Sequence, residues 1–160
     1  NLAKLSEQNK EEGQAFLATN AKVPEIVVEP SGLQYRIIKS GSGPKPTAND
    51  LLFVQYRGTL LNGREFDHYD HYLTEMSGGL KGWQQALQRM RVGDQWQLFV
   101  PPDLGFGHEG EPAHEVGPDA TLIYELDMLE IAKPGDPRIG TGRIGHGLGG
   151  QDAPEPQQSK

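Results

Sequence analysis

Carboxylate, imidazole and aromatic side chains are concentrated in one short stretch, LNGREFDHYDHY, which runs from Leu61 to Tyr72. Within it His68 and His71 have the spacing H-x-x-H, and Asp67 and Asp70 are interleaved with them. Imidazoles and carboxylates bind transition metals, and they also exchange protons in acid–base catalysis. Aromatic side chains with a few polar groups can instead line a binding pocket. These residue types alone leave all three kinds of site open.

The local context of this stretch weakens the metal interpretation. On a helix the H-x-x-H spacing could place both imidazoles on one face, but the stretch contains Asn62-Gly63, the strongest short hairpin signal. In an irregular loop the spacing carries no geometric information, and a His/Asp site also needs convergent ligands and supporting hydrogen bonds. His108 and His114, which come from a later loop, could approach the mouth of a pocket lined by this stretch. We therefore predict no metal and no cofactor, and we expect solvated loop histidines that adjust the charge at the mouth of a pocket.

Nucleophilic catalysis and nucleic-acid binding also lack support in the sequence. The chain has no cysteine, and Ser31, Ser40, Ser42 and Ser77 lie in turns rather than in an elbow such as G-x-S-x-G. The formal net charge is -7 and no window is strongly basic, so the phosphate contacts that drive nucleic-acid binding are not provided. No apolar run is long enough to span a bilayer, and no signal-peptide pattern occurs in this sequence.

The elements that must position these residues follow from the hydrophobic pattern. Trp83, Leu87 and Met90 stand at i, i+4 and i+7, which predicts a short helix with one buried face. Alternating and strand-forming residues predict the strands Gly32–Ile38, Leu51–Leu60, Gln95–Val100 and Thr121–Ile131, and a return strand that begins at the letters GREF. Several antiparallel strands with one short helix indicate an α+β domain with the helix on one face of the sheet.

Changes in composition divide the chain of 160 residues into three parts. Residues 1–29 form a helical arm with few apolar residues, which either packs against a partner chain or a further segment, or is a frayed and exposed arm. Residues 30–132 form the α+β domain. Residues 133–160 are rich in Gly and Pro with almost nothing to bury, so we expect a flexible tail.

Aromatic side chains come from five separate elements of the predicted domain: Tyr56, Phe66, Trp83, Phe106 and Tyr124. Tyr56 lies on the strand face that carries Val54, and Trp83 lies on the buried side of the predicted helix. From the residues alone, the simpler interpretation is a sealed aromatic core, because large rings are usually buried. The alternative is that these rings surround an open pocket.

Longer segments resemble the FKBP-type peptidyl-prolyl isomerases in order and spacing, over roughly Gly32 to Ile131: VQYRGTLLNGREFD, GLKGWQQALQRMRVGDQWQLFVPPDLGFG and VGPDATLIYELDMLEI. The segments KEEGQAFLATNAK and PSGLQYRIIKSGSGPKP resemble one bacterial branch, the macrophage-infectivity-potentiator-like and FkpA-like proteins. The resemblance implies a twisted antiparallel β-sheet wrapped on one short α-helix. In this branch a helical N-terminal segment joins two copies, so the resemblance also implies a homodimer through the arm.

Carried over residue by residue, the resemblance assigns the rings to a pocket for proline. Trp83 would be its floor, and its walls would be Tyr56, Phe66 and Tyr124. Leu80 and Val116 would close the rim, and the N–H of Leu80 would donate to the bound peptide. The implied catalytic residues are Asp67 at the pocket mouth, Tyr56 and Phe106.

The implied activity is cis–trans isomerisation of X-Pro bonds in unfolded or extended polypeptides, which assists protein folding. The resemblance also implies macrolide ligands of the FK506 or rapamycin type, and a periplasmic or exported location. A weakly active or non-catalytic peptide-binding chaperone is the alternative, and a metal-binding module on the His/Asp stretch is a third reading.

The chain departs from the family pattern in two places. Phe106 stands where the family commonly has a tyrosine, so the ring is kept and the hydroxyl is lost. Residues 68–81 form a shorter segment than usual, and it lacks the aromatic strand residue and the arginine often found there. Gly78-Gly79 replaces bulkier residues before Leu80, which predicts a looser wall.

Overall fold

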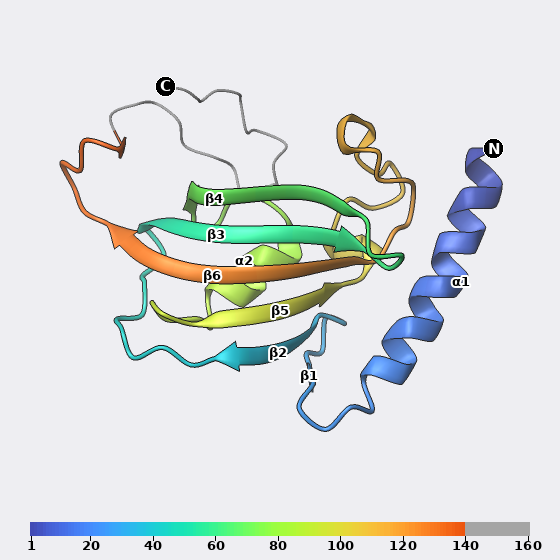
Figure 1. Ribbon diagram of the computed structural model, residues 1–160, viewed down its shortest axis with the longest axis horizontal. Coiled ribbons are helices and arrows are strands. Elements are labelled where there is room, and N and C mark those ends of the chain that lie inside the picture. The colour runs from blue at the N-terminus through green and yellow to red at the C-terminus, as the bar shows by residue number, and fades with distance from the viewer. Residues whose placement is uncertain (140–160) are drawn as a thin grey trace.

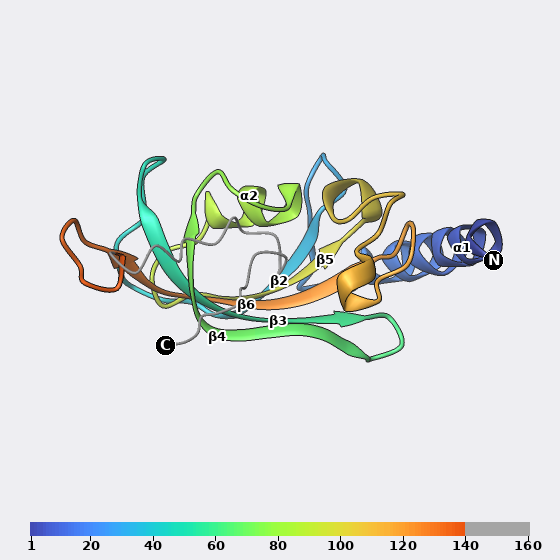
Figure 2. The same ribbon diagram turned by 90° about the horizontal axis from the view of Figure 1, so that it is seen from above.

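A six-stranded antiparallel sheet curves around one short helix in the computed structural model, which describes residues 1–139 (Figures 1 and 2). The strand order is β1-β2-β5-β6-β3-β4. The strands are β1 (Val27–Val28), β2 (Gln34–Lys39), β3 (Leu51–Leu60), β4 (Glu65–Glu75), β5 (Gln95–Val100) and β6 (Leu122–Ala132). The helices are α1 (Leu2–Asn20) and α2 (Lys81–Leu87), with the short 3₁₀ turns η1 (Pro102–Leu104) and η2 (Pro112–His114). The predicted fold class is confirmed.

The core lies between α2 and the concave face of the sheet (Figure 2). Alternate residues of β3 point toward α2, and Leu52, Val54 and Tyr56 expose almost no surface. Trp83 and Leu87 of α2 are fully buried on the opposite side of this core. Burial of a large apolar side chain contributes about 1.5–3 kcal/mol, so the hydrophobic alternation of the strands fixes which face meets the helix.

A β-bulge interrupts the pairing of β3 with β4 and keeps two tyrosines on the core side. The register pairs Val54 with Tyr72 and Tyr56 with Tyr69, so two residues of β4 lie opposite one residue of β3. Because of the extra residue, Tyr69 and Tyr72 both pack on the core although they are three positions apart. The expectation of an irregular loop after Phe66 is therefore wrong, since β4 continues to Glu75.

Helix α1 packs on its own chain at one end of the sheet (Figures 1 and 2). The ring of Phe16 lies 5.8 Å from that of Phe99 on β5, and the Asn20 side chain donates to Gln34 Oε1 at 2.8 Å. The buried residues of the helix are Ser6 and Gly13. Neither expected arrangement of the arm anticipated this docking, because small and polar residues such as Ser6 and Gly13 take part in it beside Phe16 and leave no apolar stripe in the sequence.

Beyond β6 the chain folds back onto the face of the sheet opposite α2. Arg138 donates to both carboxylate oxygens of Glu130 at 3.0 Å, and its guanidinium lies 4.1 Å from the centre of the Phe53 ring. The remainder of the predicted tail, residues 140–160, lies outside the described residues. Neither α1 nor α2 is both long and apolar enough to cross a lipid bilayer.

Candidate functional site

The five aromatic residues singled out in the sequence form one continuous cluster on the α2 side of the sheet. The Trp83 ring lies 4.9 Å from that of Tyr56 and 5.4 Å from that of Tyr124. Phe66 continues the cluster at 5.6 Å from Tyr124, and Phe106 follows at 6.1 Å from Phe66. All four contacts are edge-to-face, the geometry in which aromatic quadrupoles attract.

Two further tyrosines that sequence reasoning missed extend this aromatic cluster. The Tyr72 ring lies 5.4 Å from Tyr56 and 6.3 Å from Trp83, and Tyr69 lies 5.2 Å from Tyr72. Their spacing in the sequence would put them on opposite faces of a regular strand. Only the bulge places both on the core side, and no residue in the stretch marks the bulge.

Gly58 of β3 is also part of the site, because it makes room for two of the rings. A Cβ at this position would lie 2.6 Å from Phe66 Cζ and 2.9 Å from Tyr124 Cε1. Any larger residue would therefore separate the walls contributed by β4 and β6. The signal available in the sequence is an isolated glycine inside a strand pattern, which often marks a close approach.

The exposed edge of the cluster is narrow. Trp83 and Tyr124 expose no surface, and Tyr56 exposes 1%. Asp67 and Phe106 are half-buried, so they mark the side on which the cluster meets solvent. Leu80 and Val116, the predicted rim residues, are buried members of the same core.

Asp67 projects from the start of β4, directly after Phe66, and accepts two hydrogen bonds. The Tyr56 hydroxyl donates to Asp67 Oδ2 at 2.8 Å, and the backbone N–H of His68 donates to Oδ1 at 2.8 Å. Burial raises the pKa of the Asp67 carboxyl, while the Tyr56 hydrogen bond and the charge of His114 oppose the rise. Burial and the adjacent carboxylate also raise the pKa of Tyr56, so its phenol remains a neutral donor.

Among the described residues, two rings of the cluster and one histidine whose charge acts on Asp67 carry a buried polar atom without a hydrogen-bond partner. Within the described part of the chain, Trp83 Nε1, Tyr124 Oη and His114 Nδ1 are buried and have no hydrogen-bond partner. Buried polar atoms are nearly always paired in folded proteins, so such exceptions call for an explanation. Three of them around one aromatic cluster fit a site that is completed by a bound molecule or by water.

The His68 and His71 pair does not form a shared site. Both residues lie on β4 rather than in a loop, and they are on the face of the sheet opposite α2. His68 contacts Asp70 at 2.8 Å, whereas His71 lies 3.7 Å from Glu130. Among residues 1–139 no group of three or more His, Cys, Asp or Glu side chains is placed to hold a metal ion. Their predicted position in a loop at the pocket mouth is wrong.

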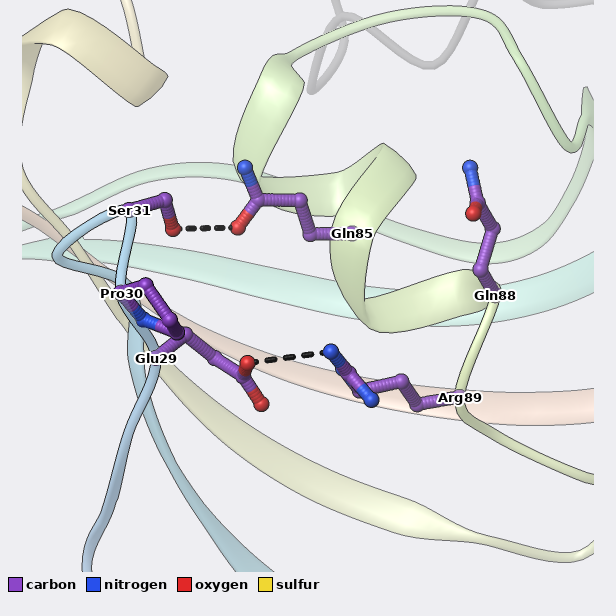
Figure 3. Close-up of a pocket in the computed structure, with 6 residues that line it drawn as sticks. All are labelled: Glu29, Pro30, Ser31, Gln85, Gln88 and Arg89. Atoms are coloured by element: carbon purple, nitrogen blue, oxygen red, sulfur yellow. Dashed lines mark hydrogen bonds and ion pairs between the residues drawn. The ribbon is translucent and has the colours of Figure 1, made fainter.

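A separate polar cavity of about 410 Å³ lies between α2 and the turn before β2 (Figure 3). Ser31 Oγ donates to Gln85 Oε1 at 2.6 Å, and Arg89 pairs with Glu29 at 3.0 Å. Gln85 follows Trp83 by two positions in α2, a spacing that places the two side chains on roughly opposite sides of the helix. These groups already satisfy one another, so the cavity has no evident role in the chemistry of the aromatic cluster.

Two known family models match this chain, over residues 1–37 and 43–129. The model described as "FKBP-type peptidyl-prolyl cis-trans isomerase" matches residues 43–129. A second model, described as "Domain amino terminal to FKBP-type peptidyl-prolyl isomerase", matches residues 1–37. The first match covers the aromatic cluster and Asp67, and the second covers α1.

Individual relatives agree with these matches. The chain is 42% identical to "Outer membrane protein MIP" of Legionella longbeachae over 81% of its own length and 57% of the relative. It is 36% identical to "Peptidyl-prolyl cis-trans isomerase Mip" of Coxiella burnetii over 78% of its length and 56% of the relative. The chain thus spans little more than half the length of these curated relatives.

Solved structures show the same fold. The crystal structure of FkpA from Escherichia coli superposes with a TM-score of 0.76 at 28% identity, over 81% of this chain and 62% of that one. A peptidyl-prolyl cis-trans isomerase from Pseudomonas syringae superposes with a TM-score of 0.73 at 28% identity, over 80% of this chain and 96% of that one.

Proposed function

Because the chain belongs to the FKBP-type peptidyl-prolyl isomerase family, we propose that it catalyses cis–trans rotation of X-Pro bonds in unfolded or extended polypeptides. One observation carries the proposal: a half-buried carboxylate, held by a tyrosine hydroxyl, adjoins an aromatic cluster whose buried polar atoms include some without a partner among residues 1–139. Trp83 is the proposed floor for the prolyl ring, and Tyr56, Phe66 and Tyr124 are the proposed walls.

Rotation of an X-Pro bond requires neither a nucleophile nor a metal. The barrier is about 18–20 kcal/mol because the amide bond has partial double-bond character, and uncatalysed exchange takes about 10–100 s. The planar amide carries more separated charge than the twisted one, so a site that excludes water disfavours the planar state. A cluster that fits a twisted prolyl bond adds differential binding of the transition state.

Asp67 and Tyr56 supply the polar part of the proposed mechanism. The hydrogen bond from Tyr56 fixes the orientation of the carboxylate, and the raised pKa of Asp67 reflects its burial. A fixed negative charge in a poorly solvated site interacts electrostatically with the carbonyl group of the X-Pro bond while that bond rotates. Since the Trp83 indole has no exposed surface, entry of proline requires a local opening, which we place at the half-buried edge between Asp67 and Phe106.

A peptide-binding chaperone with weak or absent catalysis is the second candidate. The observation that favours it is Phe106, which packs edge-to-face on Phe66 but offers no hydroxyl to a substrate carbonyl. A lost hydrogen bond of this kind is worth about 0.5–1.5 kcal/mol. Peptide binding by the cluster would survive such a loss, while the rate would fall.

Location and partners follow from the relatives and belong to the same proposal. The Legionella longbeachae relative is named as an outer membrane protein, which supports an exported or periplasmic location for this chain. Proline-containing polypeptides are the proposed partners, and macrolides of the FK506 or rapamycin type are proposed ligands of the same cluster. For the proposed homodimer through α1, the large apolar residues still exposed on that helix are Leu2 and Leu5.

The test compares the two tryptophans of the chain in a protease-coupled proline-peptide assay. Both indoles are buried, and neither Nε1 has a hydrogen-bond partner within residues 1–139, but Trp96 stacks on Tyr35 at 4.2 Å, outside the proposed site. Trp83→Phe should lower kcat/KM up to about tenfold, since aromatic contacts are worth about 0.5–1.5 kcal/mol, and Trp96→Phe should change it by less than about twofold. A wild-type chain that binds the peptide without any rate above background would establish the chaperone instead.

A further inference from the structure

The loop between β5 and β6, residues 101–121, carries Phe106 and Val116 of the proposed site, and its backbone is unusual. Among residues 1–139, the non-glycine residues with positive φ are Glu115 at 57° and Asp119 at 58°, and both lie in this loop. Residues other than glycine adopt this backbone conformation infrequently, and Asn and Asp are among those that tolerate it best. Contacts elsewhere must therefore hold the loop in this shape.

Asp119 is the point at which the loop and helix α1 meet. The Ser6 hydroxyl of α1 donates to Asp119 Oδ2 at 2.5 Å, and both residues are buried. His108 Nδ1 contacts the same oxygen at 2.8 Å, and the Asp119 backbone N–H donates to the Gly107 carbonyl at 2.9 Å. Residue 119 thus joins the helix to His108 through its carboxylate and to Gly107 through its backbone N–H.

Neighbouring contacts extend this junction along α1. The Asn9 side-chain amide donates to the Pro118 carbonyl at 2.9 Å, and a Cβ at Gly117 would lie 2.8 Å from Leu5 Cδ2. Figures 1 and 2 both show α1 beside this part of the chain. The helix is therefore in close contact with the residues that follow Val116.

The junction leads directly to the proposed site residues. Gly107, whose carbonyl accepts from Asp119, follows Phe106 in sequence. Val116 is held by paired backbone hydrogen bonds with Glu111, at 2.9 and 3.0 Å. A shift of Asp119 would therefore be felt at Phe106 on one side and at Val116 on the other.

We propose that Asp119 is a positioning residue through which helix α1 fixes the β5–β6 loop, and with it Phe106 and Val116, against the prolyl site. The catalytic part of this inference rests on the proposed function, whereas the mechanical part does not. The hydrogen bonds from Ser6 and His108 lower the pKa of Asp119, so the side chain is a carboxylate at neutral pH and a strong acceptor for both donors.

The experiment uses two variants that both tolerate the backbone conformation of position 119. Asp119→Gly removes the acceptor, and Asp119→Asn keeps an oxygen that can accept from Ser6. A hydrogen bond to a charged group is among the stronger ones, so amide hydrogen exchange in residues 105–119 should accelerate about tenfold in the glycine variant and much less in the asparagine variant. Ser6→Ala should give part of the acceleration seen in the glycine variant, because the contact of His108 with Asp119 stays, and the double variant should exchange as fast as the glycine variant alone.

Kinetics separate positioning from general loosening. A displaced wall weakens substrate and transition state alike, so KM should rise about threefold or more while kcat changes by less than about twofold. Gln8→Ala is the matched control on α1, because Gln8 is exposed and its side-chain amide donates to Glu12 of the same helix at 3.0 Å. It should leave both exchange and kinetics at wild-type values.

Two results would overturn the inference. Exchange in the loop that stays at the wild-type rate in Asp119→Gly would show that the carboxylate holds nothing. Exchange that accelerates equally in the loop and in β3 and β6 would show a general loss of stability. An inactive wild-type chain would instead count against the proposed function, and the exchange rates would still decide whether Asp119 joins α1 to the loop.

Discussion

Substitution of Phe106 is the change that we expect to raise the proposed catalytic rate of this chain. Its ring contacts Phe66, so the position is already placed at the half-buried edge of the cluster. Phe106→Tyr would add a hydroxyl donor for a substrate carbonyl, and we expect kcat/KM to rise by up to about tenfold, the equivalent of about 0.5–1.5 kcal/mol. The protease-coupled assay measures the gain directly.

The matched control places the same hydroxyl on the other ring of the pair. Phe66 is 6% exposed, so Phe66→Tyr would bury an oxygen without an evident partner. We expect no gain in rate and a loss of about 1–3 kcal/mol in the free energy of unfolding. Equal rates for the wild type and Phe106→Tyr would show that no substrate carbonyl approaches this edge.

Asp67 predicts how the activity depends on pH. Burial raises the pKa of its carboxyl, so the carboxylate that we propose to act in catalysis should be lost on acidification at a pH above the usual range for aspartate. We expect kcat/KM to fall through that pH in the wild type and to be low and independent of it in Asp67→Asn. A wild-type profile with the midpoint of an ordinary exposed aspartate would contradict this account.

The raised pKa of Asp67 affects the stability of the fold in the opposite direction, because it favours the folded state at low pH. A carboxyl whose pKa is raised in the folded state binds its proton more readily there than in the unfolded chain. Its contribution to the free energy of unfolding is therefore fully present below the unfolded pKa and is lost as pH rises through the folded pKa. Acid thus lowers the proposed activity through Asp67 without destabilising the fold through this residue.

At the scale of single elements, α1 provides a substitution whose two effects oppose each other. Gly13→Ala should favour the helix by about 1 kcal/mol on propensity alone. In the docked helix, however, the new methyl group would overlap the hydroxyl of Thr121. Overpacking of this kind costs about 1–3 kcal/mol, so we expect a net loss in the free energy of unfolding measured in urea.

A double-mutant cycle isolates the contact. Thr121→Ala removes the hydroxyl that the new methyl group would meet, and that hydroxyl is itself buried without a partner within the described residues. In this background Gly13→Ala should become neutral or stabilising. The same loss in both backgrounds would place the clash elsewhere.

How far the sequence predicts an element depends on what holds that element in place. Strands β3 and β6 and helix α2 bury apolar side chains at regular spacing, so their pattern is legible in the sequence. Docking of α1 through Ser6 and Gly13 is not, because small and polar contacts have no period. The bulge in β4 is missed for a related reason, since one extra residue breaks the two-residue period and hides Tyr69 and Tyr72.

The residues of the candidate site also differ in how far the sequence predicts them. Trp83 and Tyr56 were predicted because a face pattern and a family resemblance agree on them. Gly58 and Asp119 were missed, because their importance lies in what approaches them from distant segments.

For the whole molecule we predict one cooperative unfolding transition. A helix with as few apolar residues as α1 is marginal alone, so it should melt only when the sheet and the β5–β6 loop release it. Far-ultraviolet circular dichroism and tryptophan fluorescence should therefore give the same midpoint in urea. Ser6→Ala combined with Gln34→Ala removes hydrogen bonds at both ends of the helix and should bring the dichroism midpoint below the fluorescence midpoint.

Separate midpoints already in the wild type would show that α1 unfolds on its own. That outcome would also remove the physical basis for any influence of the helix on the loop, because a helix that detaches freely cannot hold its neighbour. Coincident midpoints in the double variant would show that other contacts, such as the one between Phe16 and Phe99, are sufficient.

Strand β4 is one of the two edges of the sheet, and its irregular register affects how the protein can meet extended chains. A long flat edge presents unpaired backbone groups that a foreign strand can join, which is a route to aggregation. The bulge twists this edge, and charged or imidazole side chains are spaced along it: Glu65, His68, Asp70, His71 and Glu75. We expect a client polypeptide to bind at the aromatic cluster and then dissociate, without pairing with β4 as a seventh strand of the sheet.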